Sequence, residues 1–183
     1  MEDFEKNELV RMVLAPYIQK STALRGKSRH TGGNQFRHAI CTFGILLDYH
    51  CIDPVILKAS FIHDIFEDTD CVHPQEIIDI DSDGRTVYEL VMEVTKAQHE
   101  TKEKYLERLL NWGSKRAKVL KCADRISNLT DLHPDILPKA FIERYLNETR
   151  KFILPMAREV NPDMFFELQD LIRRRETYLD LLS

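Results

Sequence analysis

The chain has 183 residues, 43% of them apolar, and carries a formal net charge of −4. This length and composition suit one compact domain with a buried core, and we predict a single domain over residues 1–183. The negative net charge argues against general nucleic-acid binding, and no apolar run is long enough to span a membrane. The acidic first residues and the scattered cysteines predict a cytoplasmic protein.

Helical spacing of apolar residues predicts a first helix over residues 4–20, followed by a polar loop over 21–33. Asn34 is predicted to cap a second helix that runs to about Tyr49. Asp53 followed by Pro54 is a favoured helix start, and we expect this third helix to continue to about Asp68.

His73 and Pro74 are predicted to open a short helix, and DSDG at 81–84 reads as a turn. Further helices are predicted over 84–96, 101–112, 114–130, 136–153 and 162–181. Few glycines and prolines, many strong helix formers and no hairpin signal together predict an all-α fold, a compact helical bundle.

The segment HDIFED at 63–68 places its ionisable side chains on one helical face. On a regular helix Glu67, Asp64 and Asp68 fall within about 140° of His63, and the bulky apolar residues occupy the remaining arc. Carboxylates so close together repel one another and need a cation or protonation to coexist. The segment therefore predicts a metal site that faces a cleft.

A second segment, KCADRISN at 121–128, places Asp124 on one face with Lys121, Arg125 and Asn128. With His38, the two segments supply two imidazoles and two carboxylates for one divalent ion: His38, His63, Asp64 and Asp124. This ligand set suits a borderline to hard metal, and Mn²⁺ is the predicted cofactor. Each residue alone also has an ordinary structural interpretation, such as a buried histidine, a surface ion pair or a helix end.

Residues 9–47 contain no acidic side chain but several basic ones, including Lys27, Arg29 and Arg37. Positive charge beside an acidic metal site suits a small polyanionic substrate, and a solvated basic surface is the equally simple alternative.

HDIFEDT at 63–69 and KCADRISNL at 121–129 resemble the signature motifs of the HD-domain hydrolases of the RelA/SpoT type, which degrade the alarmone (p)ppGpp. RHTGGNQFRH at 29–38 resembles the family segment R-K-S-G-E-P-Y-I-x-H, and ETRKFILPMA at 148–157 also follows a family pattern. The resemblance covers most of residues 20–160 and implies a stand-alone small alarmone hydrolase.

The resemblance implies roles position by position. The metal ligands are those given above, and Glu67 and Asp68 match the acidic pair that handles water and protons. The matches to substrate-contacting residues are Arg29, His30, Thr31 and Asn128, with Lys27 as an added positive charge. His30 stands where the family has lysine, and residues 33–35 depart from the pattern.

The implied reaction removes the 3′-pyrophosphate of ppGpp or pppGpp, leaving GDP or GTP. Arg29 could pair with phosphate or stack on the base, because a guanidinium suits both. Two alternatives stay open: a phosphatase acting on another phosphorylated nucleotide such as NADPH, and a module that binds metal or alarmone without turnover. The sequence does not predict the oligomeric state.

Overall fold

The computed structural model describes residues 3–133 and 137–181, and this part of the chain contains helices and no strand. The all-α prediction is therefore confirmed. The chain divides into two units, one made of Met1–Ser28 and Asn34–Lys96, the other of Arg29–Gly33 and Ala97–Ser183. Within the described ranges no helix has the length and apolarity that crossing a bilayer requires.

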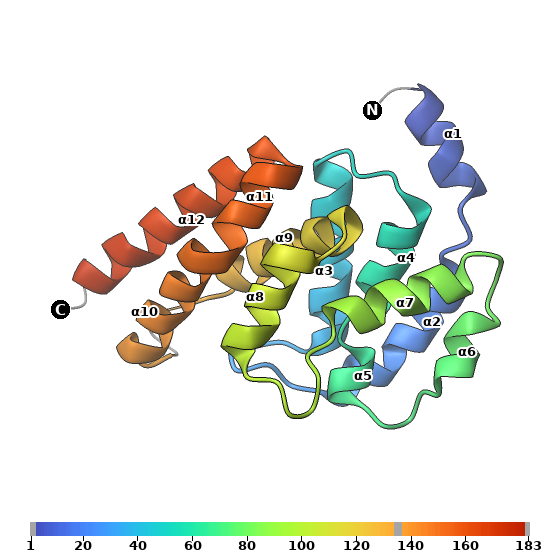
Figure 1. Ribbon diagram of the computed structural model, residues 1–183, viewed down its shortest axis with the longest axis horizontal. Coiled ribbons are helices and arrows are strands. Elements are labelled where there is room, and N and C mark those ends of the chain that lie inside the picture. The colour runs from blue at the N-terminus through green and yellow to red at the C-terminus, as the bar shows by residue number, and fades with distance from the viewer. Residues whose placement is uncertain (1–2, 134–136, 182–183) are drawn as a thin grey trace. The chain divides into compact units, whose positions relative to one another are not determined.

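The first unit is built around α4 (Pro54–Ile62), in which every residue from Val55 onward is buried. It packs against α2 (Ala15–Ser21), α3 (Gln35–Asp48) and α7 (Gly84–Val94). The remaining elements of this unit are α1 (Asp3–Arg11), the 3-10 helix η1 (Thr22–Gly26), α5 (Ile65–Asp68) and α6 (Pro74–Ile78). Figure 1 shows these elements in blue to green.

Two predicted caps of this unit are confirmed. The Asn34 side chain accepts a hydrogen bond from the backbone N–H of Arg37, and that of Asp53 accepts from the N–H groups of Val55 and Ile56. Each cap satisfies backbone donors that have no partner inside the helix. They fix the first turns of α3 and α4, the two helices that lead to His38 and His63.

Two predictions for this unit are wrong, because each joins two separate helices into one. The segment predicted as one helix over 4–20 is broken between Arg11 and Ala15, because Pro16 lies at the start of α2 and cannot continue a preceding helix. The helix predicted to run to Asp68 ends at Ile62, and a separate turn, α5, begins at Ile65. His63 and Asp64 form the junction.

The second unit has α9 (Lys115–Thr130) at its core, packed against α11 (Leu154–Val160) and α12 (Pro162–Leu181). Figure 1 shows α11 and α12 side by side in orange and red. The predicted helices 101–112, 114–130 and 162–181 are confirmed as α8 (Lys102–Trp112), α9 and α12.

The helix predicted over 136–153 is longer and less regular than expected. Its predicted first residue, 136, lies outside the described residues, and α10 covers Lys139–Glu148. The chain then continues through a π-helical turn, η2 (Thr149–Ile153), directly into α11. Single π-helical turns inside helices are rare and often occur near functional sites.

Candidate metal and proton-transfer site

Three predicted ligands of the first unit converge on one point. The Asp64 Oδ2 atom lies 3.4 Å from Nε2 of His63 and 3.8 Å from Nε2 of His38. Both imidazoles are buried, and their ring centroids are 5.2 Å apart. His38 is the fourth residue of α3, whereas His63 and Asp64 come from the α4–α5 junction.

The donor set fits a divalent metal ion. His63 Nδ1 lies 2.8 Å from the carbonyl oxygen of Ser60, which can only accept, so Nδ1 is the donor and Nε2 is the nitrogen that faces Asp64. Metal-binding histidines almost always donate their second nitrogen in this way. Ligand bonds of about 2.1 Å place neighbouring donor atoms about 3.0–3.4 Å apart. The observed separations are close to this range.

Asp68 lies at the end of α5 and is partly buried. Its Oδ2 accepts a hydrogen bond of 2.7 Å from Nε2 of Gln35, the first residue of α3. Burial raises the pKa of Asp68 and so does the negative charge of Asp64, against the opposing effects of Gln35, Lys27 and His63. A carboxyl group with a raised pKa is suited to exchange protons near neutral pH.

Glu67 is exposed, and its Oε1 accepts a hydrogen bond of 2.7 Å from the backbone N–H of Lys96. This contact ties α5 to the segment that follows α7. The two acids of the predicted pair therefore have different surroundings: Glu67 is held by a backbone amide, and Asp68 by a side-chain amide.

In the second unit the predicted ligand Asp124 is buried in α9 and held by two neighbours on the same helix. Its Oδ2 lies 2.6 Å from Nζ of Lys121, and its Oδ1 accepts a hydrogen bond of 2.5 Å from Nδ2 of Asn128. Burial would lower the pKa of Lys121, but the pairing with Asp124 raises it well above the usual value, so the ammonium stays charged.

Arg29 is nearly buried in the second unit and uses both terminal nitrogens. Nη1 pairs with Oδ2 of Asp131, and Nη2 donates to Oδ1 of Asn128, each at 2.7 Å. The loop that carries Arg29 turns through Gly32 and Gly33, which both have positive φ, a conformation that glycine adopts without strain. Arg29, Asn128 and Asp124 thus form one hydrogen-bonded series.

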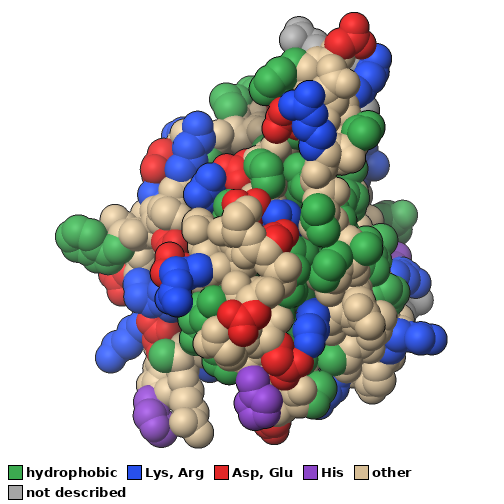
Figure 2. Space-filling view, turned by 90° about the vertical axis from the view of Figure 1, so that its right-hand side faces the viewer, with side chains coloured by type: hydrophobic (Ala, Val, Ile, Leu, Met, Phe, Trp, Pro, Cys, Tyr) green, Lys and Arg blue, Asp and Glu red, His purple; other side chains and the backbone are tan. Residues whose placement is uncertain are grey.

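The other predicted substrate residues are less constrained. Lys27 and His30 are exposed, and the buried Oγ1 of Thr31 has no hydrogen-bond partner among the described residues. Figure 2 shows acidic and basic side chains interspersed over one face, as on an ordinary solvated surface. Arg125, which the helical pattern grouped with Asp124, is instead buried over the Tyr145 ring at 3.9 Å.

Sequence reasoning missed two residues of these networks, Gln35 and Asp131. Gln35 departs from the family pattern within the segment 29–38, and Asp131 lies just beyond the second motif. Their partners are 33 and 102 positions away along the chain. The available signal was that each is a polar residue within or next to a motif. Local periodicity does not predict partners so far away along the chain.

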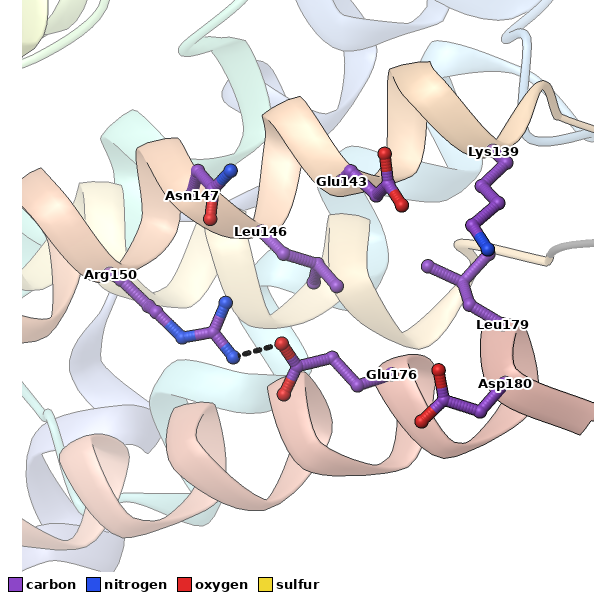
Figure 3. A pocket seen from close by; sticks show the side chains of 8 residues that line it. All are labelled: Lys139, Glu143, Leu146, Asn147, Arg150, Glu176, Leu179 and Asp180. Atoms are coloured by element: carbon purple, nitrogen blue, oxygen red, sulfur yellow. Dashed lines mark hydrogen bonds and ion pairs between the residues drawn. The ribbon is translucent and has the colours of Figure 1, made fainter.

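A cavity of about 440 Å³ lies elsewhere in the second unit, between α10 and α12 (Figure 3). Arg150 and Glu176 pair across it. The cavity is lined by Lys139, Glu143, Leu146, Asn147, Arg150, Glu176, Leu179 and Asp180. None of these is a predicted site residue. The lining holds no histidine, so this cavity lacks the imidazoles that the predicted metal site requires.

The sequence was compared with known proteins. No protein-family model matches it. It is 31% identical over 147 residues to the guanosine-3′,5′-bis(diphosphate) 3′-pyrophosphohydrolase MESH1 of Drosophila melanogaster, covering 75% of this chain and 79% of that protein.

A second relative is the protein named "Probable GTP diphosphokinase RSH3, chloroplastic" of Arabidopsis thaliana. It is 24% identical over 185 residues, which cover 87% of this chain, but the chain spans only 26% of that relative's length.

Among solved structures, one described as a metazoan ortholog of SpoT that hydrolyses ppGpp matches with a TM-score of 0.76 and 26% identity. The match covers 88% of this chain and 94% of that one. The fold is therefore shared over nearly the whole length of both chains.

Proposed function

Since the chain belongs to the family of stand-alone guanosine-3′,5′-bis(diphosphate) 3′-pyrophosphohydrolases that includes MESH1, we propose that it hydrolyses the 3′-pyrophosphate of (p)ppGpp. The products are pyrophosphate and GDP or GTP. The observation that carries this proposal is the convergence of His38, His63 and Asp64 on one point, with the partly buried Asp68 following on α5.

His38, His63 and Asp64 hold one divalent ion together with Asp124. Support comes from their types and burial: both imidazoles and Asp124 are buried and are potential metal ligands. A bound ion supplies Lewis acidity toward water and phosphoryl oxygens. Mn²⁺ is the proposed metal, because nitrogen and oxygen donors in equal number suit a borderline to hard ion.

Glu67 and Asp68 carry the protons of the reaction. A water oxygen bonds to the phosphorus attached to the 3′-oxygen, the bond from that phosphorus to the 3′-oxygen breaks, and the 3′-oxygen takes a proton. Glu67 and Asp68 take the water's proton and return one to the leaving oxygen, a contribution of about 10²–10⁴-fold. The surroundings of Asp68 favour its protonated form more than water would.

Arg29 contacts the nucleoside end of the substrate with the flat face of its guanidinium. Support comes from its hydrogen bonds, because Asp131 balances its charge and Asn128 occupies its second terminal nitrogen. Those bonds lie in the guanidinium plane, so a planar group can still stack on the face. Phosphate binding then relies on another positive charge, and Lys27 is the proposed contributor. His30 and Thr31, on the loop that carries Arg29, are proposed to contact the substrate as well.

The domain organisation, the location and the partners of the chain are also part of the proposal. We expect one functional domain over residues 1–183, a cytoplasmic location, a small nucleotide as the substrate, and no nucleic-acid partner.

The direct test incubates the purified chain with ppGpp and Mn²⁺, separates the nucleotides, and measures pyrophosphate and phosphate. We expect GDP and pyrophosphate in equal amounts and no product in the presence of a chelator. Release of single phosphates from ppGpp, or faster turnover of NADPH in the same panel, would favour the phosphatase alternative. Binding of ppGpp without hydrolysis would favour the non-catalytic module.

A further inference from the structure

We infer that Gln35 is a positioning residue for Asp68: its side-chain amide holds the carboxyl group in the orientation needed for proton transfer. This inference rests on the proposed function, because it assigns Gln35 to the same reaction. The contact that carries it is the 2.7 Å hydrogen bond from Nε2 of Gln35 to Oδ2 of Asp68.

The position of Gln35 in the fold suits this role. Gln35 is the first residue of α3, one turn before the predicted ligand His38, and Asp68 is the last residue of α5. The bond therefore joins the helix of one predicted ligand to the short helix that follows the other two. Any tilt of α5 that moved Asp68 relative to this helix would stretch the bond.

The Gln35 side chain does not cap the start of α3. The N-cap of α3 is provided by Asn34, whose side chain accepts from the N–H of Arg37. The backbone N–H of Gln35 donates separately to the carbonyl oxygen of Lys27 at 2.9 Å. The amide group is thus committed to Asp68 instead of to capping.

An amide suits a carboxyl group that changes its protonation state. Nε2 donates to the ionised carboxylate, whereas the amide oxygen, after a rotation of the amide group, accepts from the protonated form. A glutamate or a methionine in the same place would serve only one state or neither. Gln35 can therefore keep Asp68 in place before and after it gives up its proton.

The second observation concerns the amide oxygen. Oε1 of Gln35 is buried and has no hydrogen-bond partner among the described residues. A buried acceptor without a partner is costly and is commonly satisfied by water. While Nε2 donates to the ionised carboxylate of Asp68, the direction of Oε1 is set as well. Oε1 offers an acceptor to a water or a substrate hydroxyl beside the carboxyl group that exchanges the proton.

The test compares Gln35→Met with a matched control elsewhere in the same unit. Gln75 on α6 also donates through Nε2 to an aspartate, Asp79, at 2.6 Å, but this pair is exposed and has no proposed role. We expect Gln35→Met to lower kcat on ppGpp by about 10–100-fold, a part of the roughly 10²–10⁴-fold that general acid–base catalysis contributes. KM should change by less than about threefold, and Gln75→Met should match the wild type.

A double-mutant cycle separates positioning from general destabilisation. In an Asp68→Asn background, measured above the uncatalysed rate, Gln35→Met should cause no further loss, because its effect passes through the Asp68 carboxyl group. Mn²⁺ affinity, measured by calorimetry, should equal that of the wild type. Gln35→Glu, which keeps the size but places two carboxylates together, should lower kcat at least as far, and it replaces Gln35→Met in the cycle if that variant does not fold.

The outcomes distinguish the inference from the proposed function. If the wild type does not hydrolyse ppGpp, the proposed function fails and the inference fails with it. If the wild type is active but Gln35→Met retains its kcat, only the positioning role is overturned. A loss that multiplies with that of Asp68→Asn, or a loss of Mn²⁺ affinity, also overturns it.

Discussion

At the scale of single residues, Arg29 shows how a basic side chain can be present without offering free charge. Its guanidinium is paired with Asp131 and bonded to Asn128, which in turn donates to Asp124. The pairing orients the group and removes the freedom that a solvated arginine would lose on binding. In the proposed function, Asp131 holds the Arg29 guanidinium in place for contact with the substrate.

We predict that Asp131→Asn raises KM for ppGpp by about tenfold and changes kcat by less than about threefold. A hydrogen bond to a charged group contributes roughly 1.5–3 kcal/mol, and part of it remains with asparagine. Steady-state kinetics measures both constants. The matched control is Asp170→Asn, because Asp170 pairs with Arg173 and Arg174 on the exposed surface of α12. An unchanged KM in Asp131→Asn would contradict the orienting role.

The sequence predicts that His38, His63 and Asp64 lie together because two imidazoles and a carboxylate are potential ligands of one divalent ion, and all three side chains meet at Oδ2 of Asp64. The supporting contacts of Gln35 and Asp131 are not predicted in this way. A glutamine or an aspartate next to a motif is compatible with many surface roles. Only the folded chain brings such a residue to a partner far along the sequence.

At the scale of elements, the junction between α4 and α5 determines how the first motif presents its side chains. On one continuous helix His63 and Asp64 would point about 100° apart. The backbone instead leaves the helical path at Asp64, with φ −98° and ψ 1°, and its carboxylate lies 3.4 Å from the ring of His63. The interruption lets neighbouring residues reach one point.

Helix starts were predicted well because they depend on local chemistry. Asn34, Asp53 and Ser114 cap their helices through their own side chains, and each such contact spans two or three residues. The junction after Ile62 was not predicted, because the apolar pattern continues across it. The π-helical turn at Thr149–Ile153 was missed for the same reason.

An ion-pair cluster joins α4 to the turn before α7 and should make stability depend on pH. Lys58 is buried and pairs with Asp81 at 2.8 Å and with Asp83 at 2.7 Å. Burial alone would raise the pKa of Asp81, but hydrogen bonds from Lys58 and Tyr17 lower it below the usual value. A lowered pKa in the folded state stabilises the fold above the unfolded pKa, and this stabilisation is lost as the pH falls through the folded value.

We therefore predict that Asp81→Asn lowers the free energy of unfolding at pH 7 by about 1–3 kcal/mol, with a smaller difference from the wild type below about pH 4. Denaturant titrations followed by circular dichroism at pH 3 to 7 measure this. Asp79→Asn, an exposed aspartate of the same unit, should differ little from the wild type. A constant difference across this pH range would show that Asp81 contributes through packing instead of charge.

At the scale of the whole molecule, a bound metal should stabilise the fold by mass action. A ligand at about 100 times its Kd adds about 2.7 kcal/mol, which for a chain of this size raises Tm by roughly 5–10 °C. We predict such a rise on adding Mn²⁺ to the wild type and none in Asp64→Ala, measured by differential scanning calorimetry. Asp79→Asn should respond like the wild type. An equal rise in Asp64→Ala would refute its assignment as a ligand.

The segment Arg29–Gly33 affects how the two units could be expressed as separate fragments. These residues belong to the second unit although the chain on both sides of them belongs to the first. A fragment expressed from residue 97 onward would lack the arginine that neutralises Asp131, and a fragment ending at residue 96 would leave that arginine without its acid. Each fragment would contain one member of the Arg29–Asp131 ion pair without the other, so the chain cannot be divided at residue 96 without breaking this pair.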